Sequence, residues 1–324
     1  MNWLFENPIS ELPGPLFLGL YAGVIALVIV EAIWRKSRAD HSLELGPEPI
    51  PTKPDPVEIA YLRGGENEVT RLLVFDLIRR GYLQIETTPA KLGTVTDSRI
   101  SQVADHPDLA QLRPIERDVF DFFQHSSKPE YLFKSGGLSS RIKGGTGVLV
   151  EKLREDQLIT GPDQVSAAWR FWLSGALMIL AFGGFKFAVA IAKGKHNVAF
   201  LVLMAVVGLI ALAFTCSVPR LTRRGRDYVA RLRDAFEGLK PRLAEAEETA
   251  PYDPAFVLVP AIFGVSALVG TPFAYAPTLF RTAAAQSSGG CGGYVGGCGG
   301  AAAGGGGGCG GGGCGGGGCG GCGG

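Results

Sequence analysis

The sequence predicts an α-helical membrane protein with a small α+β cytoplasmic domain, made of tandem winged-helix-like units, and a disordered Gly/Cys-rich tail. Three observations predict this fold class. Long apolar runs begin at Leu16, Trp169 and Asn197. The stretch between the first two runs mixes helical and strand patterns. The end of the chain is almost only glycine and holds six of the seven cysteines, so it lacks side chains that bury a core.

The first apolar run predicts a membrane helix over 16–34, after a short external N-terminus, 1–15. It contains one charge, Glu31. Its length is roughly 28 Å at about 1.5 Å per residue, close to the ~30 Å hydrocarbon core. A cleaved signal peptide needs basic residues before the run, but "MNWLFENPISELPGP" has none, while "RKSR" follows. This charge pattern keeps the basic end in the cytoplasm and the N-terminus outside.

The second and third apolar runs predict a helical hairpin over 169–191 and 197–216. The short "AKGKH" joins them, and Trp169 and Trp172 stand where interfacial aromatic residues usually lie. The third run is followed by "PRLTRRGRDYVARLR", which has six arginines and one aspartate and indicates the cytoplasmic side. Two crossings then return the chain to the side that holds 35–168, so both charge signals give the same topology.

Two further segments flank these runs. A Pro-rich linker is predicted over 35–56, where repeated X-Pro bonds favour an extended backbone. A basic juxtamembrane helix is predicted over 219–250. We expect four of its arginines to contact anionic lipid headgroups: Arg220, Arg223, Arg224 and Arg226.

The apolar segment 255–280 is interpreted in two ways. It is long enough to span, but prolines and glycines divide it, and a proline in a helix interior costs about 3 kcal/mol. An interfacial helix, or one packed on the cytoplasmic domain, is favoured over a fourth membrane segment. This choice decides on which side of the membrane the tail lies.

The domain between the anchors is predicted over 57–165. Val57–Arg63 is a short helix that ends at Gly64-Gly65, and a second helix, 66–80, has an apolar 3-4 spacing of which only the aliphatic residues form a buried stripe. "YLQIETT" alternates like a half-buried strand. "LRPIERDVFDFF", with Pro114 in its first turn, and "GGTGVLVEKLREDQLIT", a helix running into a strand, form a second unit of this kind.

A winged-helix plan suggests DNA binding, but the charge balance does not. Residues 35–163 carry 18 bases and 20 acids, and a DNA reader needs clustered basic residues. Arg71, Arg79 and Arg80 are interpreted as solvated charges. The sequence therefore favours a protein partner for the domain over nucleic acid.

No catalytic constellation is visible, so we predict that the protein is not an enzyme and holds no cofactor. The four histidines are scattered. The tail, 287–324, stays open to several interpretations: a flexible tether, a site for soft metals such as Zn or Cu(I), a clustering segment, or a substrate whose cysteines become thiazoles. Only the last two of its cysteines have Cys-x-x-Cys spacing; the set is Cys291, Cys298, Cys309, Cys314, Cys319 and Cys322.

Several of these motifs, taken in order, resemble an uncharacterised family of bacterial membrane proteins. They are "DPVEIAYLRGGENEVTRLLVFDLIRRGYLQI", "LTRRGRDYVARLRDAFEGL" and the Gly/Cys end. The resemblance covers most of 54–280 and implies a conserved cytoplasmic domain of unknown function, a bacterial inner-membrane location with several passes, and a low-complexity C-terminus. It brings no catalytic residue with it.

The expected function is therefore that of an interaction or scaffold protein with a flexible tail. Two alternatives remain open: a thiol-based metal-binding or thiazole-modified tail protein, and a membrane-bound DNA-binding regulator.

Overall fold

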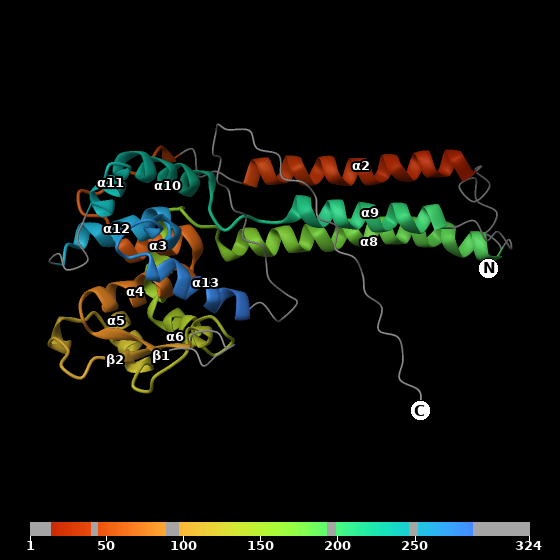
Figure 1. Cartoon of the computed structure of the whole chain (residues 1–324). Helices are drawn as coiled ribbons and strands as arrows, with labels where there is room; N and C mark the ends of the chain where they lie inside the picture. The colour runs from red at the N-terminus through yellow and green to blue at the C-terminus, as the bar shows by residue number, and fades with distance from the viewer. Residues whose placement is uncertain (1–13, 40–44, 89–96, 193–198, 246–251, 288–324) are drawn as a thin grey trace, which may run out of the picture. The chain divides into compact units, whose positions relative to one another are not determined.

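The computed structural model describes residues 14–39, 45–88, 97–192, 199–245 and 252–287 (Figure 1). Its elements form a bundle of long helices and a domain with its own hydrophobic core. Residues 288–324, almost the whole Gly/Cys-rich tail, lie outside the described residues.

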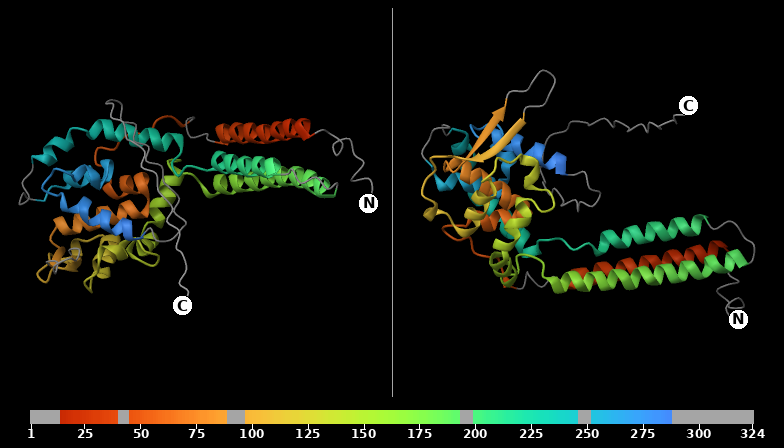
Figure 2. Two further views of the ribbon diagram at one scale, coloured as in Figure 1. Left: turned by 45° about the vertical axis from the view of Figure 1, so that its right-hand side comes forward. Right: turned by 90° about the horizontal axis from the view of Figure 1, so that it is seen from below.

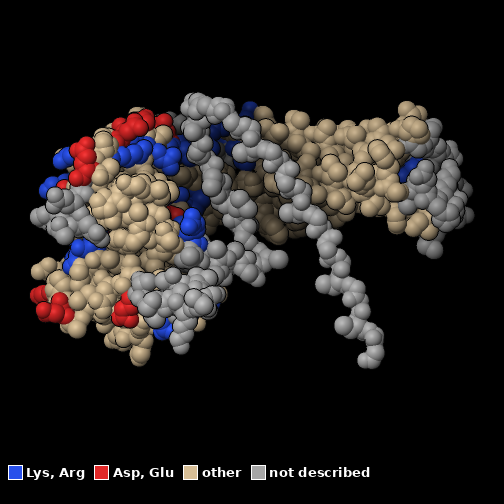
Figure 3. Space-filling model, in the orientation of Figure 1, with Lys and Arg blue, Asp and Glu red and all other residues tan. Residues whose placement is uncertain are grey.

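Three helices are long and apolar enough to cross a membrane: α2 (Gly14–Ala39), α8 (Pro162–Ala192) and α9 (Ala199–Cys216). They coincide with the three predicted apolar runs, although α8 begins seven residues before Trp169. On the face drawn in Figure 3, the bundle surface is almost free of charged side chains, which gather over the domain. This is the surface expected of helices in contact with lipid.

The bundle is held by one face of α2 against α8 and α9. Residues at 3-4 spacing on α2 are buried there: Phe17, Tyr21, Ile25, Val28 and Ala32. The Tyr21 hydroxyl donates a hydrogen bond to the Ile179 carbonyl over 3.1 Å. Gly183 of α8 lies under the Tyr21 ring, where a Cβ would meet the hydroxyl at 2.7 Å. Small residues thus let the helices approach closely, as membrane helices commonly require.

The domain begins with two helices, α3 (Pro56–Gly64) and α4 (Glu66–Arg79). Asp55 caps α3 by accepting from the Val57 amide over 3.0 Å. Between the helices Gly65 adopts φ +73°, a conformation that favours glycine and ends α3 as the sequence predicts.

A single hairpin follows α4, formed by β1 (Leu83–Thr88) and β2 (Asp97–Gln102) (Figure 2). The strands pair antiparallel, with Leu83 opposite Gln102 and Thr88 opposite Asp97. The predicted strand in "YLQIETT" is thereby confirmed.

The next part of the domain is helical. Its elements are η3 (Leu109–Gln111), α5 (Pro114–Phe122), η4 (Pro129–Leu132), α6 (Leu138–Gly145) and α7 (Gly147–Glu155). Pro114 opens α5 as predicted. No strand pair follows α7 in the described residues, only an isolated bridge between Ile159 and Leu221. The second unit therefore lacks a wing, and tandem winged-helix units are not confirmed.

After the bundle the chain returns to the same domain. It forms α10 (Arg223–Phe236), α11 (Leu239–Ala244), α12 (Pro254–Phe263), η5 (Val265–Leu268) and α13 (Tyr275–Ser287). Backbone hydrogen bonds pair 158–160 with 220–222, where the chain leaves and re-enters the domain. One core contains buried residues of both halves, from Val57 to Ile159 and from Tyr228 to Phe280.

The apolar segment 255–280 belongs to this core. α12 packs on α3 and α4, and Val259, Ala261 and Ile262 are fully buried. Gly264 ends α12 and Gly270 follows η5, and these two glycines with positive φ fold the segment into short pieces. The breaks that weaken a membrane helix are here the turns of a compact core.

Helix α4 lies at the centre of the domain, between α3 and α12 on one side and α5, α6 and the hairpin on the other (Figure 1). Of its residues only Asn67 is exposed, and the others are buried or half-buried. The expectation that only an aliphatic stripe of this helix is buried is wrong, since Thr70 and Asp76 are also buried. Packing on several sides leaves α4 without a solvent face.

Candidate functional site

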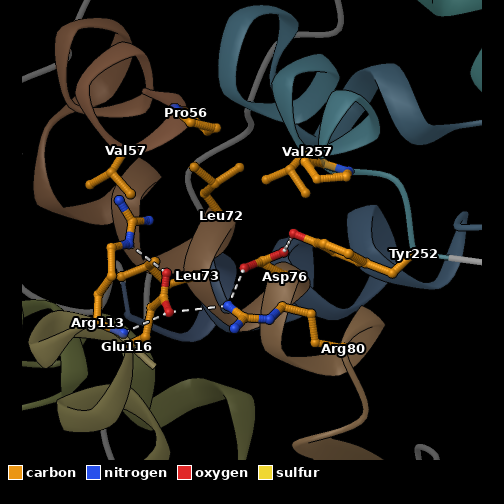
Figure 4. A pocket seen from close by; sticks show the side chains of 11 residues that line it. Pro56, Val57, Leu72, Leu73, Asp76, Arg80, Arg113, Glu116, Tyr252 and Val257 are labelled. Atoms are coloured by element: carbon orange, nitrogen blue, oxygen red, sulfur yellow. Dashed lines mark hydrogen bonds and ion pairs between the residues drawn. The ribbon is translucent and has the colours of Figure 1, made fainter. Parts of the chain in front are cut away.

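A cavity of about 200 Å³ lies where α3, α4, α5 and the start of α12 meet (Figure 4). Aliphatic side chains form one part of its wall and a charge network forms the other. The lining residues are Pro56, Val57, Leu72, Leu73, Asp76, Arg80, Arg113, Glu116, Tyr252, Pro254 and Val257.

The network runs through four charged side chains and one phenol. Arg80 Nη1 lies 3.3 Å from Asp76 Oδ2 and 3.1 Å from Glu116 Oε2. Tyr252 donates its hydroxyl to Asp76 Oδ1 over 2.7 Å. Arg113 donates to Glu116 twice, from Nε over 2.7 Å and from its backbone amide over 3.0 Å.

The two acids are buried, with side chains only 8% (Asp76) and 4% (Glu116) exposed. They reach this position because both follow apolar helical spacing: Asp76 on α4 and Glu116 in the first turn of α5, where its carboxylate accepts from the backbone amide of the N-cap residue Arg113. Arg80, the C-cap residue of α4, stands one turn after Asp76. One helix and its C-cap therefore supply both members of this ion pair.

Burial affects the two carboxyls differently. Burial raises the pKa of Asp76, against the opposing effect of the Tyr252 hydrogen bond and the Arg80 charge. Burial also acts to raise the pKa of Glu116, but hydrogen bonds from the amide and side chain of Arg113 outweigh it and lower that pKa. Burial and the neighbouring Asp76 charge raise the pKa of Tyr252.

Every carboxylate oxygen of Asp76 and Glu116 accepts a hydrogen bond from a protein donor. Neither acid is therefore placed as a free general base or nucleophile. What the arrangement does is join three distant segments, α4, α5 and the residues before α12, through interactions that are strong when buried.

The family assignment rests on a match to the whole central part of the chain. Residues 47–237, more than half of the 324 residues, match the family model "Predicted membrane protein (DUF2207) C-terminal domain". The chain belongs to this family. No curated protein and no solved structure matches it. Tyr252, which completes the charge network, lies after the matched segment.

Other arginines of this DUF2207 protein also make contacts inside the fold. Arg71 pairs with Glu68 and lies 4.8 Å from the Phe133 ring centre. Arg79 lies 4.3 Å from the Phe273 ring centre. The interpretation of Arg71, Arg79 and Arg80 as solvated charges is therefore wrong, because acids on α4 and α5 and the rings of two connecting segments contact them.

The four arginines proposed for lipid headgroups fall into two groups. Arg220 donates to the Leu62 carbonyl over 3.1 Å and lies over the Tyr61 ring. Arg224 pairs with Glu48 of the linker and donates to the Asp156 carbonyl over 2.7 Å. Both thus have partners within the domain. Arg223 and Arg226 are exposed on α10. Their contact with lipid stays a prediction.

The six tail cysteines, Cys291 to Cys322, lie outside the described residues. Within the described ranges, no group of three or more His, Cys, Asp or Glu is arranged to hold a metal ion. The sequence did contain a signal for the network that was missed: an acid on the apolar spacing of 66–80 with an arginine four residues later.

Proposed function

We propose that this DUF2207 protein is a membrane-anchored interaction protein whose domain binds a protein partner and carries no catalytic centre of its own. One observation carries the proposal: the charged groups of the cavity are bonded to one another. The cavity, about 200 Å³, is smaller than the roughly 300–1,000 Å³ of ordinary ligand pockets. Because these charges are paired with one another inside the domain, we infer that the domain recognises its protein partner through its outer surface.

The same proposal includes a topology. Because one core contains residues from before α8 and after α9, both halves of the domain must lie on one side of any membrane that α8 and α9 cross. The basic residues after α2 and after α9 favour the cytoplasmic side of a bacterial inner membrane. The tail would then begin on that side, since α12 and α13 belong to the domain.

The DNA-binding alternative gains little from the fold. In a winged helix the helix before the hairpin enters the groove, and here that helix is α4. Its burial leaves no face for a DNA groove. An outcome that would restore this alternative is duplex binding by the full-length protein at low salt that falls steeply as salt is added.

Crosslinking in growing cells tests the partner. A photo-crosslinking residue would replace Val148, which is 87% exposed on α7, or Val269, which is 68% exposed after η5. Leu177, 68% exposed on the apolar surface of α8, serves as the control. We expect a discrete protein adduct from a domain position and none from Leu177. Absence of any protein adduct at the domain positions would reject the interaction role.

The tail supports a second candidate role, because it sets six cysteines singly among glycines. Thiolates of this kind bind Zn or Cu(I), and flexible neighbours also suit enzymatic conversion to thiazoles. The intact mass of the tail, released from protein made in the native host, separates these roles. Loss of water and two hydrogens per cysteine indicates thiazoles, whereas an unmodified mass leaves metal binding, to be tested by titration with Zn and Cu(I).

A further inference from the structure

We propose that the bundle holds a binding site for the phosphate of an anionic phospholipid, in a hollow between the end of α2 and the first turns of α8. This site is separate from the α10 arginines. The inference requires the bundle to lie in a membrane, but it does not depend on the interaction role of the domain.

The hollow has a volume of about 290 Å³ and is lined by Arg35 of α2 and by Ala167, Arg170, Phe171 and Ser174 of α8. Small side chains, Ala167 and Ser174, leave the space open. Two guanidinium groups border it, one from each helix. A planar guanidinium offers paired donors that match phosphate oxygens.

The two arginines are not equally occupied. Arg35 is held by Glu31, at 2.6 Å and 3.0 Å, and its guanidinium lies 4.8 Å from the Phe171 ring centre. Arg170 is exposed, and its guanidinium makes no hydrogen bond or ion pair with any residue that the structure describes. Glu31 and Phe171 therefore hold Arg35 in place at the edge of the hollow, whereas the N–H donors of the Arg170 guanidinium are available to a ligand.

Two other basic side chains at this end of the bundle already have partners. Lys36 donates to the carbonyls of Thr215 and Ser217, over 3.2 Å and 2.7 Å, at the end of α9. Arg38 lies 3.8 Å from the Trp34 ring centre. Lys36 and Arg38 add positive charge around the hollow, which the Glu31 carboxylate offsets only in part. Because they are held by these partners, they do not themselves bind the ligand of the hollow.

The surroundings identify the ligand as a lipid and not a free phosphate. Trp169 and Trp172, on the same turns of α8 as the lining residues, stack with ring centres 5.0 Å apart and mark the level at which aromatic residues meet lipid headgroups. The Trp172 indole nitrogen is buried without a hydrogen-bond partner in the described residues. Beyond it the outer faces of the helices are apolar, with Leu173 and Leu177 exposed. A headgroup can occupy the hollow while its acyl chains lie along this surface.

Native mass spectrometry of the full-length protein in a non-ionic detergent tests the site. The protein is titrated with phosphatidylglycerol or with phosphatidylcholine, and bound lipid is counted. We expect phosphatidylglycerol to bind more tightly, and Arg170→Gln to weaken its first binding step about tenfold. Arg141→Gln, the same change at an exposed position of α6, should leave that step within about twofold of wild type.

Two further variants keep the test decisive if Arg170→Gln folds poorly. Arg170→Lys retains the charge and should keep most of the binding. Ser174→Phe fills the hollow without altering any charge and should weaken binding as Arg170→Gln does. Equal binding of both lipids, or unchanged binding by Arg170→Gln and Ser174→Phe, would overturn the proposal. Displacement of the lipid by an equal concentration of glycerol phosphate would show that the ligand is a soluble phosphate.

Discussion

The charge network around Glu116 should contribute measurably to the stability of the domain, and Glu116→Gln isolates that contribution. The carboxylate accepts three hydrogen bonds, from Arg80 Nη1 and from the amide and Nε of Arg113. A glutamine keeps the shape but offers one acceptor oxygen and turns an amide NH₂ group toward donors. The variant therefore loses a buried charge and leaves the two arginines with fewer acceptors.

The magnitude follows from the partners that remain. Removing one member of a buried ion pair costs about 3–5 kcal/mol. Here Arg80 keeps Asp76, and the Arg113 side chain is 47% exposed, so water replaces part of what it loses. We therefore expect a loss of about 2–3 kcal/mol in the free energy of unfolding. Glu130→Gln, which removes a 3.8 Å pair to Lys134 at the surface, should cost less than about 0.5 kcal/mol.

The assay is urea unfolding of the full-length protein in detergent, followed by hydrogen exchange in peptides of α4 and α5. The pH dependence gives a second readout. The Glu116 pKa is lowered in the fold, so its contribution is present above the ordinary value of 4.5 and is lost as the pH falls below it. In Glu116→Gln the free energy of unfolding should therefore fall less as the pH drops below this value. If both variants unfold at the same urea concentration, the network does not hold the domain as argued.

Three other predictions use matched positions. Gly225→Ala places a Cβ against a backbone carbonyl and should destabilise the docking of α10, whereas Gly144→Ala, with open space around it, should be neutral, as thermal denaturation would show. Burial raises the pKa of Tyr228 to about 12, so stability should fall as pH rises above 10, and Tyr228→Phe should reduce that fall in urea titrations. Gly183→Leu should loosen α2 from α8, measured as faster proteolysis in detergent, while Gly184→Leu should not.

The parts of the fold that follow from local signals could be predicted from the sequence. The apolar runs, the end of α3 at Gly65, the β1 strand and the start of α5 at Pro114 each depend on neighbouring residues. These signals act within a few residues, so a single sequence contains them.

The charge network could be predicted only in part. Asp76 and Arg80 have i,i+4 spacing, but their partners Glu116 and Tyr252 are 36 and 176 residues away from Arg80 and Asp76, respectively. The spacing of residues along a single helix or strand gives no information about contacts between residues so far apart in the sequence. For the same reason α4 was expected to be half-exposed, because the helices that cover its other faces come from distant parts of the sequence.

The shared core of the domain sets an order for its biosynthesis. The first half cannot bury its apolar residues fully until α12 has been made, and α8 and α9 are translated in between. Roughly 100 residues at about 5–20 residues per second take on the order of 5–20 seconds. During that interval the sides of α3 and α4 that later contact α12 face water. Synthesis of α8 and α9 therefore precedes completion of the domain, and a nascent chain halted after α9 and before α12 should depend on a chaperone.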